Sequence, residues 1–344
     1  MKLSEELAWR GFVNQTTYPD MSALDGDPIS FYFGVDPSAD SMQIGNLAAA
    51  MMVRHFIDHG HHAYLLVGGA TGMIGDPDGK KDERNLQTLE AIDHNKQAIA
   101  AQYKTVFAGK DFTVVDNYDW FKELNYIDFL RTVGKNVPLS QMLGREFVQS
   151  RLGTDGSGIS YAEFSYSLIQ GYDFVHLSRT YDVTLQLCGA DQWGNSIAGV
   201  DLIRRMDNKE AHVYSTPLVV NKTTGAKFGK SEGGAIWLDP AKTSVYAFYQ
   251  FWLNAGDADV IDWLKVFTVL SKEAIDDLER DTHENPQRRM AQKVLAREVT
   301  SIVHGGDRAQ SAEAVSRVLF GEMNFADILD EDLELIANEL TVVG

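Results

Sequence analysis

Short apolar segments alternate with longer amphipathic segments through the first two-thirds of this sequence, and this alternation constrains the fold most. The predicted buried strands lie at 29–35, 63–67, 112–115 and 183–187. Continuous apolar runs of this kind are typical of strands that are covered on both faces. We therefore expect an α/β fold with a Rossmann-like parallel sheet, flanking helices, and ligand sites at the carboxyl ends of the strands.

Beyond about residue 244 the pattern is helical only, which predicts a small all-helical domain, and the stretch 321–344 is acidic without Lys or Arg. The net charge of −18 argues against broad nucleic-acid binding, because phosphate contacts need clustered cations. The single cysteine, Cys188, excludes a disulfide framework. The N-terminus reads as an acidic amphipathic helix, and no apolar run reaches the length of a membrane span. We expect a cytoplasmic protein without a membrane partner.

A strand followed by a glycine-containing helix start forms the first candidate site, in GVDPSADSMQIGNL. Either Asp40 or Ser41 is expected to cap a helix running to about residue 60. Gly45 keeps the first turn open, so phosphate oxygens could approach its free N–H groups, with Gln43 and Asn46 as amide donors. The alternative is a tightly packed helix start without a ligand.

Two glycine-rich segments carry cations. LVGGATGMIGDPDGKKDER follows an apolar strand and contains Lys80 and Arg84, and KFGKSEGG contains Lys227 and Lys230. Neither segment is a P-loop or a GxGxxG motif, which disfavours a Rossmann dehydrogenase. We interpret both as sites where a polyphosphate is neutralised. The alternatives are a surface turn with a solvated charge run and an ordinary hairpin.

Three polar residues share one face of a predicted helix in SYAEFSYSLIQGYDF. Tyr166, Gln170 and Asp173 follow each other at spacings of four and three. Buried without partners they would be costly, and a small ligand bearing hydroxyl and ammonium groups would satisfy them. A solvated helix face is the alternative.

Taken together, these segments resemble bacterial tyrosyl-tRNA synthetase, a class I aminoacyl-tRNA synthetase. The resemblance lies in the order and spacing of FYFGVDPSADSMQIGNL, LVGGATGMIGDPDGKK, NYDW, FSYSLIQGYDF, GADQWGN, KFGKSEGG and FYQFWLN. It implies a catalytic domain at 1–221 with an inserted dimerisation segment at about 120–160. It also implies a KMSKS-type loop and linker at 222–243, a helical anticodon-side domain at 244–320, and an acidic tail at 321–344.

The resemblance also implies roles for individual residues. The residues implied to bind tyrosine are Tyr32, Asp76, Asn117, Tyr166, Gln170, Asp173 and Gln192. The residues implied to bind ATP or the adenylate are Asp36, Ser38, Gly45, Gly189, Asp191, Lys227 and Lys230. The residues implied to be catalytic are Gln43, Asn46, Lys80, Arg84, Lys227, Lys230 and Ser231. The implied partners are L-tyrosine, ATP with Mg²⁺, and tRNA(Tyr), and the implied assembly is a homodimer.

Two features depart from the family pattern. The HIGH signature reads QIGN here, and Gln43 in its first position keeps a donor but is longer than histidine and cannot become cationic. Family members also continue into a small basic domain resembling ribosomal protein S4, whereas nothing after Gly321 resembles it. We therefore expect either a shortened chain or a naturally short paralogue.

Three other interpretations of the sequence compete with this one. A metal cluster formed by His55, His59, His61 and His62 is disfavoured relative to a solvated helix end. A catalytically idle RNA-binding or regulatory paralogue is suggested by QIGN, although the intact amino-acid pocket argues against it. A tryptophan-specific sister synthetase shares the architecture, and the pair Tyr32 and Asp173 favours tyrosine.

Overall fold

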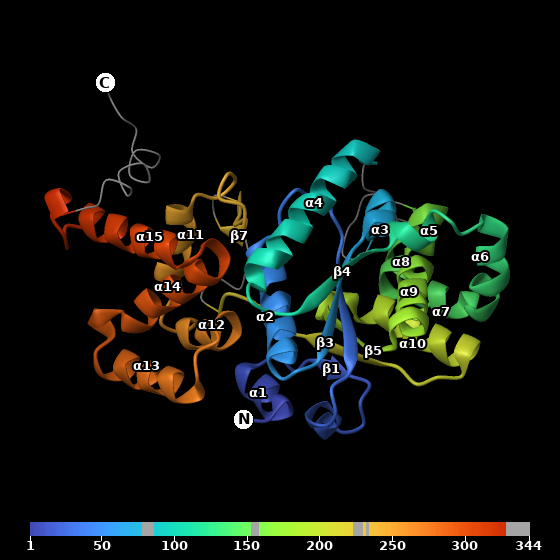
Figure 1. Ribbon diagram of the computed structural model, residues 1–344, viewed down its shortest axis with the longest axis horizontal. Coiled ribbons are helices and arrows are strands. Elements are labelled where there is room, and N and C mark those ends of the chain that lie inside the picture. Colours follow the sequence, from blue (N-terminus) through green and yellow to red (C-terminus); the bar gives the residue numbers. More distant parts are fainter. Residues whose placement is uncertain (78–85, 153–157, 223–229, 232–233, 328–344) are drawn as a thin grey trace.

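The computed structural model describes residues 1–77, 86–152, 158–222, 230–231 and 234–327. A six-stranded sheet with the strand order β1-β6-β5-β2-β3-β4 forms its centre, and helices cover both faces (Figure 1). A separate two-stranded ribbon pairs β7 with β8. The strands are β1 (Gln15–Thr16), β2 (Ser30–Val35), β3 (His62–Val67), β4 (Phe112–Asp116), β5 (Val183–Gly189), β6 (His212–Thr216), β7 (Lys230–Ser231) and β8 (Gly234–Ala235).

The central sheet is parallel from β6 to β4, which confirms the predicted fold class, and all four predicted strands are present. The short edge strand β1 pairs antiparallel with β6, so the sheet is mixed. Neither β1 nor β6 was anticipated. The chain passes from β2 outward to β3 and β4, and then returns to build β5 and β6 on the other side of β2. A crevice at the carboxyl ends of β2 and β5 is therefore the expected ligand site.

The helices are named in chain order. The α-helices are α1 (Leu3–Arg10), α2 (Ile44–Asp58), α3 (Gly69–Ile74), α4 (Leu89–Val106), α5 (Tyr118–Phe121), α6 (Tyr126–Thr132), α7 (Leu139–Leu143), α8 (Glu146–Leu152), α9 (Tyr161–Tyr181), α10 (Trp193–Asp207), α11 (Val245–Leu253), α12 (Val260–Phe267), α13 (Lys272–Glu284), α14 (Met290–His304) and α15 (Gly306–Leu319). Short 3₁₀ turns lie at Met21–Asp25, Gly134–Asn136, Ala190–Gln192, Pro286–Arg288 and Phe325–Asp327. In the described part of the chain, no helix combines the length and apolar character that crossing a bilayer requires.

The two faces of the sheet bury separate apolar clusters. Helices α2 and α4 lie on one face and α9 and α10 on the other (Figure 1). The cluster on the α2 side continues without a break into α11–α14, where Trp252 and Phe267 are fully buried. The helical region after residue 244 is thus packed onto the α/β unit through a shared apolar core.

The start of α2 differs from the sequence prediction. The N-cap is Gln43, two or three residues later than the predicted Asp40 or Ser41. Asp40 instead pairs with Lys242, with 2.7 Å between Oδ1 and Nζ. The Ser41 hydroxyl donates to the carbonyl of Met42 at 2.9 Å, so it is not available to cap the helix. The helix ends at Asp58, close to the predicted end.

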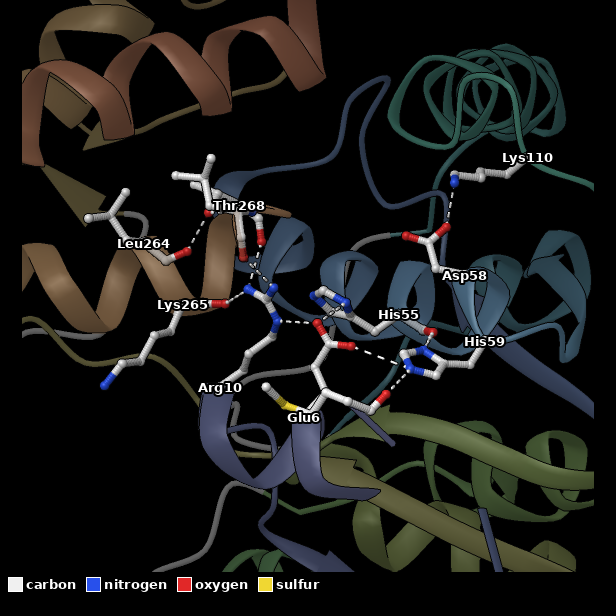
Figure 2. Close-up of polar contacts among 11 residues, drawn as sticks. Glu6, Arg10, His55, Asp58, His59, Lys110, Leu264, Lys265 and Thr268 are labelled. Carbon is white, nitrogen blue, oxygen red and sulfur yellow. Dashed lines mark hydrogen bonds and ion pairs between the residues drawn. The ribbon is translucent and has the colours of Figure 1, made fainter. Parts of the chain in front are cut away.

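Helix α1 joins the α/β unit to the helical region through a buried arginine (Figure 2). The Arg10 guanidinium donates to the carbonyls of Lys265 and Thr268 at 2.8 and 3.0 Å, and to that of Leu270 at 2.8 Å. It also donates to Glu6 Oε1 at 2.8 Å. The positive charge thus lies at the carboxyl end of α12, where it is favoured by the helix dipole.

Two of the four histidines at the end of α2 contradict the prediction of a solvated helix end. His55 and His61 are only 3% and 5% exposed. His55 Nδ1 lies 3.3 Å from Glu6 Oε1, and burial lowers the pKa of His55 to about 2. His59 Nε2 lies 3.5 Å from Glu6 Oε2 (Figure 2). His55 and His59 thus belong to the contact between α1 and α2, and His61 lies 3.1 Å from the carbonyl of Leu24, so these three have a packing role, whereas His62 is exposed as predicted.

Candidate active site

A cavity of about 400 Å³ opens at the carboxyl ends of β2 and β5, where the order of the strands reverses. The start of α2 and the middle of α9 form its other walls. Thirteen of the residues implied by the resemblance line it together: Tyr32, Asp36, Ser38, Gln43, Gly45, Asn46, Asp76, Tyr166, Gln170, Asp173, Gly189, Asp191 and Gln192. Segments from Tyr32 to Gln192, far apart in sequence, therefore converge on one site.

Helix α9 supplies three of these residues from one face, as the spacing predicted. Its start is set by Ser160, whose hydroxyl accepts from the backbone N–H of Glu163 at 3.2 Å. It continues for 21 residues to Asp182, which has φ 52° and ends the helix. Tyr166, Gln170 and Asp173 all face the cavity, so the alternative of a solvated helix face is wrong.

Asp173 is a buried carboxyl held by two donors. Its side chain is 1% exposed. Trp120 Nε1 donates to Oδ1 at 3.0 Å, and Asn117 Nδ2 donates to Oδ2 at 3.1 Å. Burial raises the pKa of Asp173 well above its usual range, while the hydrogen bonds from Asn117 and Trp120 act in the opposite direction. The two donors thus favour the ionised form of a group that burial alone would neutralise.

Asn117 lies behind Asp173 and does not line the cavity. It was implied to bind the amino acid, and the structure places it in contact with the carboxyl that faces the cavity. Its Nδ2 also donates to Thr71 Oγ1 at 3.1 Å, and its Oδ1 accepts from the backbone N–H of Ala70 at 2.6 Å. Any influence of Asn117 on a ligand therefore passes through Asp173 or Thr71.

A second carboxyl, Asp36 at the end of β2, is fixed in the same way. Thr71 Oγ1 donates to Oδ1 at 2.6 Å and Tyr166 Oη donates to Oδ2 at 2.7 Å. A Cβ at Gly68 would collide with both Asp36 and Thr71, which explains at least this glycine of the LVGGATG segment. The lack of space beside Asp36 and Thr71 is therefore enough to explain Gly68, without a phosphate bound to its backbone.

The sequence motifs imply no role for Trp120 or Thr71, although NYDW contains Trp120 and LVGGATG contains Thr71. Each of these residues holds a carboxyl that faces the cavity. The one sequence feature that could have pointed to them is their place shortly after a predicted strand, since Trp120 follows β4 and Thr71 follows β3. Such a signal is weak, because polar residues commonly follow strands in loops.

Unpartnered polar atoms mark the floor of the cavity. Among the described residues, Tyr32 Oη, Gln170 Oε1 and Gln186 Oε1 are buried and have no hydrogen-bond partner. An unpaired buried polar group costs about 1–3 kcal/mol, so three of them in one cavity indicate a polar ligand. Gln192 Nε2 donates to Asp76 Oδ2 at 2.6 Å, and both residues line the cavity.

The QIGN segment forms the wall opposite α9. Asn46 Oδ1 accepts from the backbone N–H of Gln43 at 3.0 Å, which turns its Nδ2 donors away from that contact. Gly45 is exposed in the first turn of α2. A helix N-terminus without side-chain bulk, flanked by two amides, is suited to an anionic oxygen.

Comparison with known proteins agrees with this geometry. The family model described as class I tRNA synthetases (W and Y) matches residues 24–321. The chain belongs to this family. The match confirms the family that the sequence motifs indicated.

Individual relatives are similar over most of their length. The tyrosine–tRNA ligase of Limosilactobacillus reuteri is 46% identical over 97% of this chain and 80% of its own. Tyrosine–tRNA ligase 2 of Bacillus cereus is 49% identical over 93% of this chain and 77% of its own. The crystal structure of a C-terminally truncated mitochondrial tyrosyl-tRNA synthetase from Aspergillus nidulans has a TM-score of 0.83 at 28% identity, covering 93% of this chain and 94% of that one.

The cationic residues of this class I synthetase are the part of the implied site that the structure does not place. Lys80, Arg84 and Lys227 lie outside the described residues. Lys230 and Ser231 are described in their backbone only, where they pair with Ala235 and Gly234. The described lining of the cavity contains no Lys or Arg.

Proposed function

We propose that the chain is a tyrosine–tRNA ligase, which activates L-tyrosine with ATP and transfers it to tRNA(Tyr). The observation that carries this proposal is the buried pair formed by Tyr32 and Asp173 at the floor of the cavity. Relatives that are 46–49% identical bear the same name, which favours tyrosine over tryptophan and argues against an idle paralogue.

The pair suits a phenolic hydroxyl. Asp173 can accept a hydrogen bond from the phenolic O–H, and Tyr32 Oη, which is unpartnered among the described residues, can donate to the phenolic oxygen. A phenylalanine side chain would leave both groups buried and unsatisfied, which is strongly unfavourable. The pair therefore accounts for recognition of the hydroxyl.

The other end of the amino acid would lie toward the cavity mouth. Asp76, Tyr166 and the unpartnered Gln170 Oε1 offer acceptors for an ammonium group. Gln192, bonded to Asp76, would lie near the reacting carboxylate. The carboxylate would then point toward the QIGN wall, where the phosphates of ATP are expected.

For ATP we propose that Gln43 and Asn46 donate to phosphate oxygens beside the open helix start at Gly45, with Ser38 close by. Asp36, Gly189 and Asp191 would contact the adenylate. Lys80, Arg84, Lys227, Lys230 and Ser231 would serve the pyrophosphate, as the motifs imply. A tyrosine carboxylate oxygen attacks the α-phosphorus as the bond to pyrophosphate breaks, so orientation and charge stabilisation carry the catalysis.

Mg²⁺ would enter with ATP. The described part of the chain has no group of three or more His, Cys, Asp or Glu side chains arranged to hold a metal. The carboxyls of Asp36 and Asp76 already accept hydrogen bonds from Thr71, Tyr166 and Gln192. The triphosphate itself would therefore provide the ion's oxygen ligands, as is usual for nucleotide-bound Mg²⁺.

We also propose a cytoplasmic homodimer, with the domain division that the sequence predicted. Apolar side chains are unusually exposed in the segment from Tyr126 to Leu152: Tyr126 is 59%, Ile127 66% and Leu139 60% exposed. Exposed apolar patches commonly mark protein contacts. Light scattering that detects only monomer at micromolar concentration would refute the dimer. The acidic tail from residue 328 lies outside the described residues.

Exchange of labelled pyrophosphate into ATP tests the proposed activity. Exchange that depends on L-tyrosine is expected for the purified chain with ATP and Mg²⁺. Absence of exchange with every amino acid would favour an idle paralogue, and exchange with tryptophan would select the sister synthetase. Charging of a tRNA(Tyr) transcript, measured separately, tests the transfer step.

A further inference from the structure

A strand-like segment after the KFGKS motif pairs with the QIGN motif. Gln43 and Trp237 form an antiparallel bridge. The N–H of Leu238 donates to the carbonyl of Met42 at 2.9 Å, and the N–H of Ile44 donates to the carbonyl of Ile236 at 3.1 Å. Immediately before this segment, Lys230 pairs with Ala235 in the ribbon β7–β8. Only Ile236 and Trp237 thus separate the ribbon that contains Lys230 from Leu238, the residue bonded to Met42.

The side chain of Gln102 on α4 forms hydrogen bonds with Ser41 and Met42, the two residues before Gln43, and we call this contact the clasp. Gln102 Oε1 accepts from the N–H of Met42 at 2.7 Å, and Gln102 Nε2 donates to Ser41 Oγ at 2.8 Å. The backbone N–H can only donate, so the orientation of the Gln102 amide follows from the contacts themselves. Both ends of one amide are therefore engaged by two consecutive residues.

Ser41 connects the clasp to the paired segment at residues 236–239. Its hydroxyl, in a side chain that is 5% exposed, accepts from the N–H of Asp239 at 3.1 Å and donates to the carbonyl of Met42. That carbonyl also accepts from Leu238. Gln102, Ser41 and the segment after KFGKS thus form one hydrogen-bonded unit. Removing the Gln102 amide would leave the buried N–H of Met42 without this partner.

We propose that Gln102 and Ser41 are positioning residues for adenylate formation, which fix the QIGN helix start and the exit of the KFGKS loop relative to each other. The inference rests on the proposed function, in which both motifs act on the phosphates of ATP. Neither side chain lines the cavity, so neither touches a substrate. The tyrosine pocket lies on α9 and β2 and makes no use of the clasp. Loss of the clasp should therefore affect the ATP-dependent step and spare tyrosine binding.

The test compares Gln102→Ala with Gln97→Ala, an exposed glutamine five positions earlier on the same helix. In tyrosine-dependent pyrophosphate exchange, Gln102→Ala should lower kcat about 10- to 100-fold and raise the KM for ATP, because small displacements of reacting groups have effects of that size. Its Kd for tyrosine, measured by equilibrium dialysis without ATP, should stay within about twofold of the parent. Gln97→Ala should match the parent in all three quantities.

Further variants separate positioning from loss of structure. Gln102→Glu keeps the acceptor for Met42 and loses the donor to Ser41, so it should recover part of the activity that Gln102→Ala loses. Ser41→Ala should resemble Gln102→Ala, and the double variant should be less impaired than the product of the two single effects, because both act on one unit. Wild-type-like exchange by Gln102→Ala, or an equal loss of tyrosine affinity, would overturn the proposal. Absence of exchange by the parent chain would instead refute the proposed function.

Discussion

Replacing Trp120 by phenylalanine removes one hydrogen bond from Asp173, the buried carboxyl that we propose to bind the phenolic hydroxyl of tyrosine. The Trp120 ring stacks on His176 with 4.3 Å between ring centroids and an interplanar angle of 15°. Phenylalanine keeps much of this stacking and deletes the Nε1–H that donates to Asp173 Oδ1 at 3.0 Å. The substitution therefore tests the donor with little change in packing.

The expected loss follows from the charge on the acceptor. A hydrogen bond to a charged group contributes about 1.5–3 kcal/mol, which corresponds to roughly a 10- to 150-fold weaker binding of tyrosine. Asp173 would keep the donor Asn117, so the pocket should not be abolished. The change should appear chiefly in the Kd of tyrosine, because Trp120 contacts Asp173 and does not itself line the cavity.

The pH dependence of tyrosine affinity provides a second test of the same hydrogen bond. The hydrogen bond from Trp120 lowers the pKa of Asp173, so its removal should raise that pKa further. Tyrosine affinity should fall as Asp173 becomes protonated, and in Trp120→Phe this fall should begin at a higher pH than in the parent. Equilibrium dialysis of labelled tyrosine over a pH series measures both effects, with Trp9→Phe on α1 as the matched control. A Kd within twofold of the parent and an unmoved acid limb would refute the role of this donor.

Three further predictions concern other parts of the molecule. Gln43→Ala should lower kcat for tyrosine activation by about 10²–10³, as for loss of one transition-state donor, and unchanged activation would show that Gln43 does not contact phosphate. Arg10→Met should lower the free energy of unfolding by about 3–5 kcal/mol in urea titrations, because it breaks a buried ion pair, whereas Arg280→Met at an exposed site should not. Burial lowers the pKa of His55 to about 2, so the free energy of unfolding should fall by up to about 1.4 kcal/mol per pH unit as the pH falls below 6.5. In urea titrations over a pH series, His55→Leu should lose this pH dependence. An unchanged pH dependence would show that His55 does not cause it.

The sequence predicted β2, β3, β4 and β5 and missed β1 and β6, which lie together at one side of the sheet, for a physical reason. β2, β3 and β5 lie inside the sheet and carry apolar runs. β6 reads HVYST and β1 is only Gln15–Thr16, so neither has the apolar pattern of a covered strand. The polar side chains of β6 are satisfied across the sheet edge: Ser215 Oγ, for example, donates to the carbonyl of Gln15 at 3.1 Å. Such long-range partners cannot be read from local pattern.

The same limit explains the errors at both ends of α2. Ser41 is a good N-cap by residue type, but its hydroxyl is taken by Met42, Gln102 and Asp239. The sequence predicts a solvated His55 because nothing in it shows that α1 packs against this end of α2. In both cases a partner from a distant segment decides the outcome. The face of α9, by contrast, depends only on helical spacing, and its prediction held.

The residues that face the cavity could be inferred from motifs, whereas those behind it could not. Tyr32, Asp36 and Asp173 belong to segments with a distinctive chemistry and spacing. Trp120 and Thr71 act by fixing the orientation and charge of these carboxyls, and their contribution depends on tertiary geometry. Supporting residues of this kind are needed for any preorganised site, although the sequence gives them no separate signature.

The charges of the described part of the site should affect the binding of tyrosine and of ATP in opposite ways. Its lining includes Asp36, Asp76, Asp173 and Asp191 and no Lys or Arg among the residues that the structure describes. This half of the site should attract the ammonium group of tyrosine and repel a triphosphate. The cations that the sequence places in the two glycine-rich segments, together with Mg²⁺, would have to offset that repulsion. Tyrosine should therefore bind measurably without ATP, whereas ATP affinity should depend on those segments and on the pairing that Gln102 holds in place.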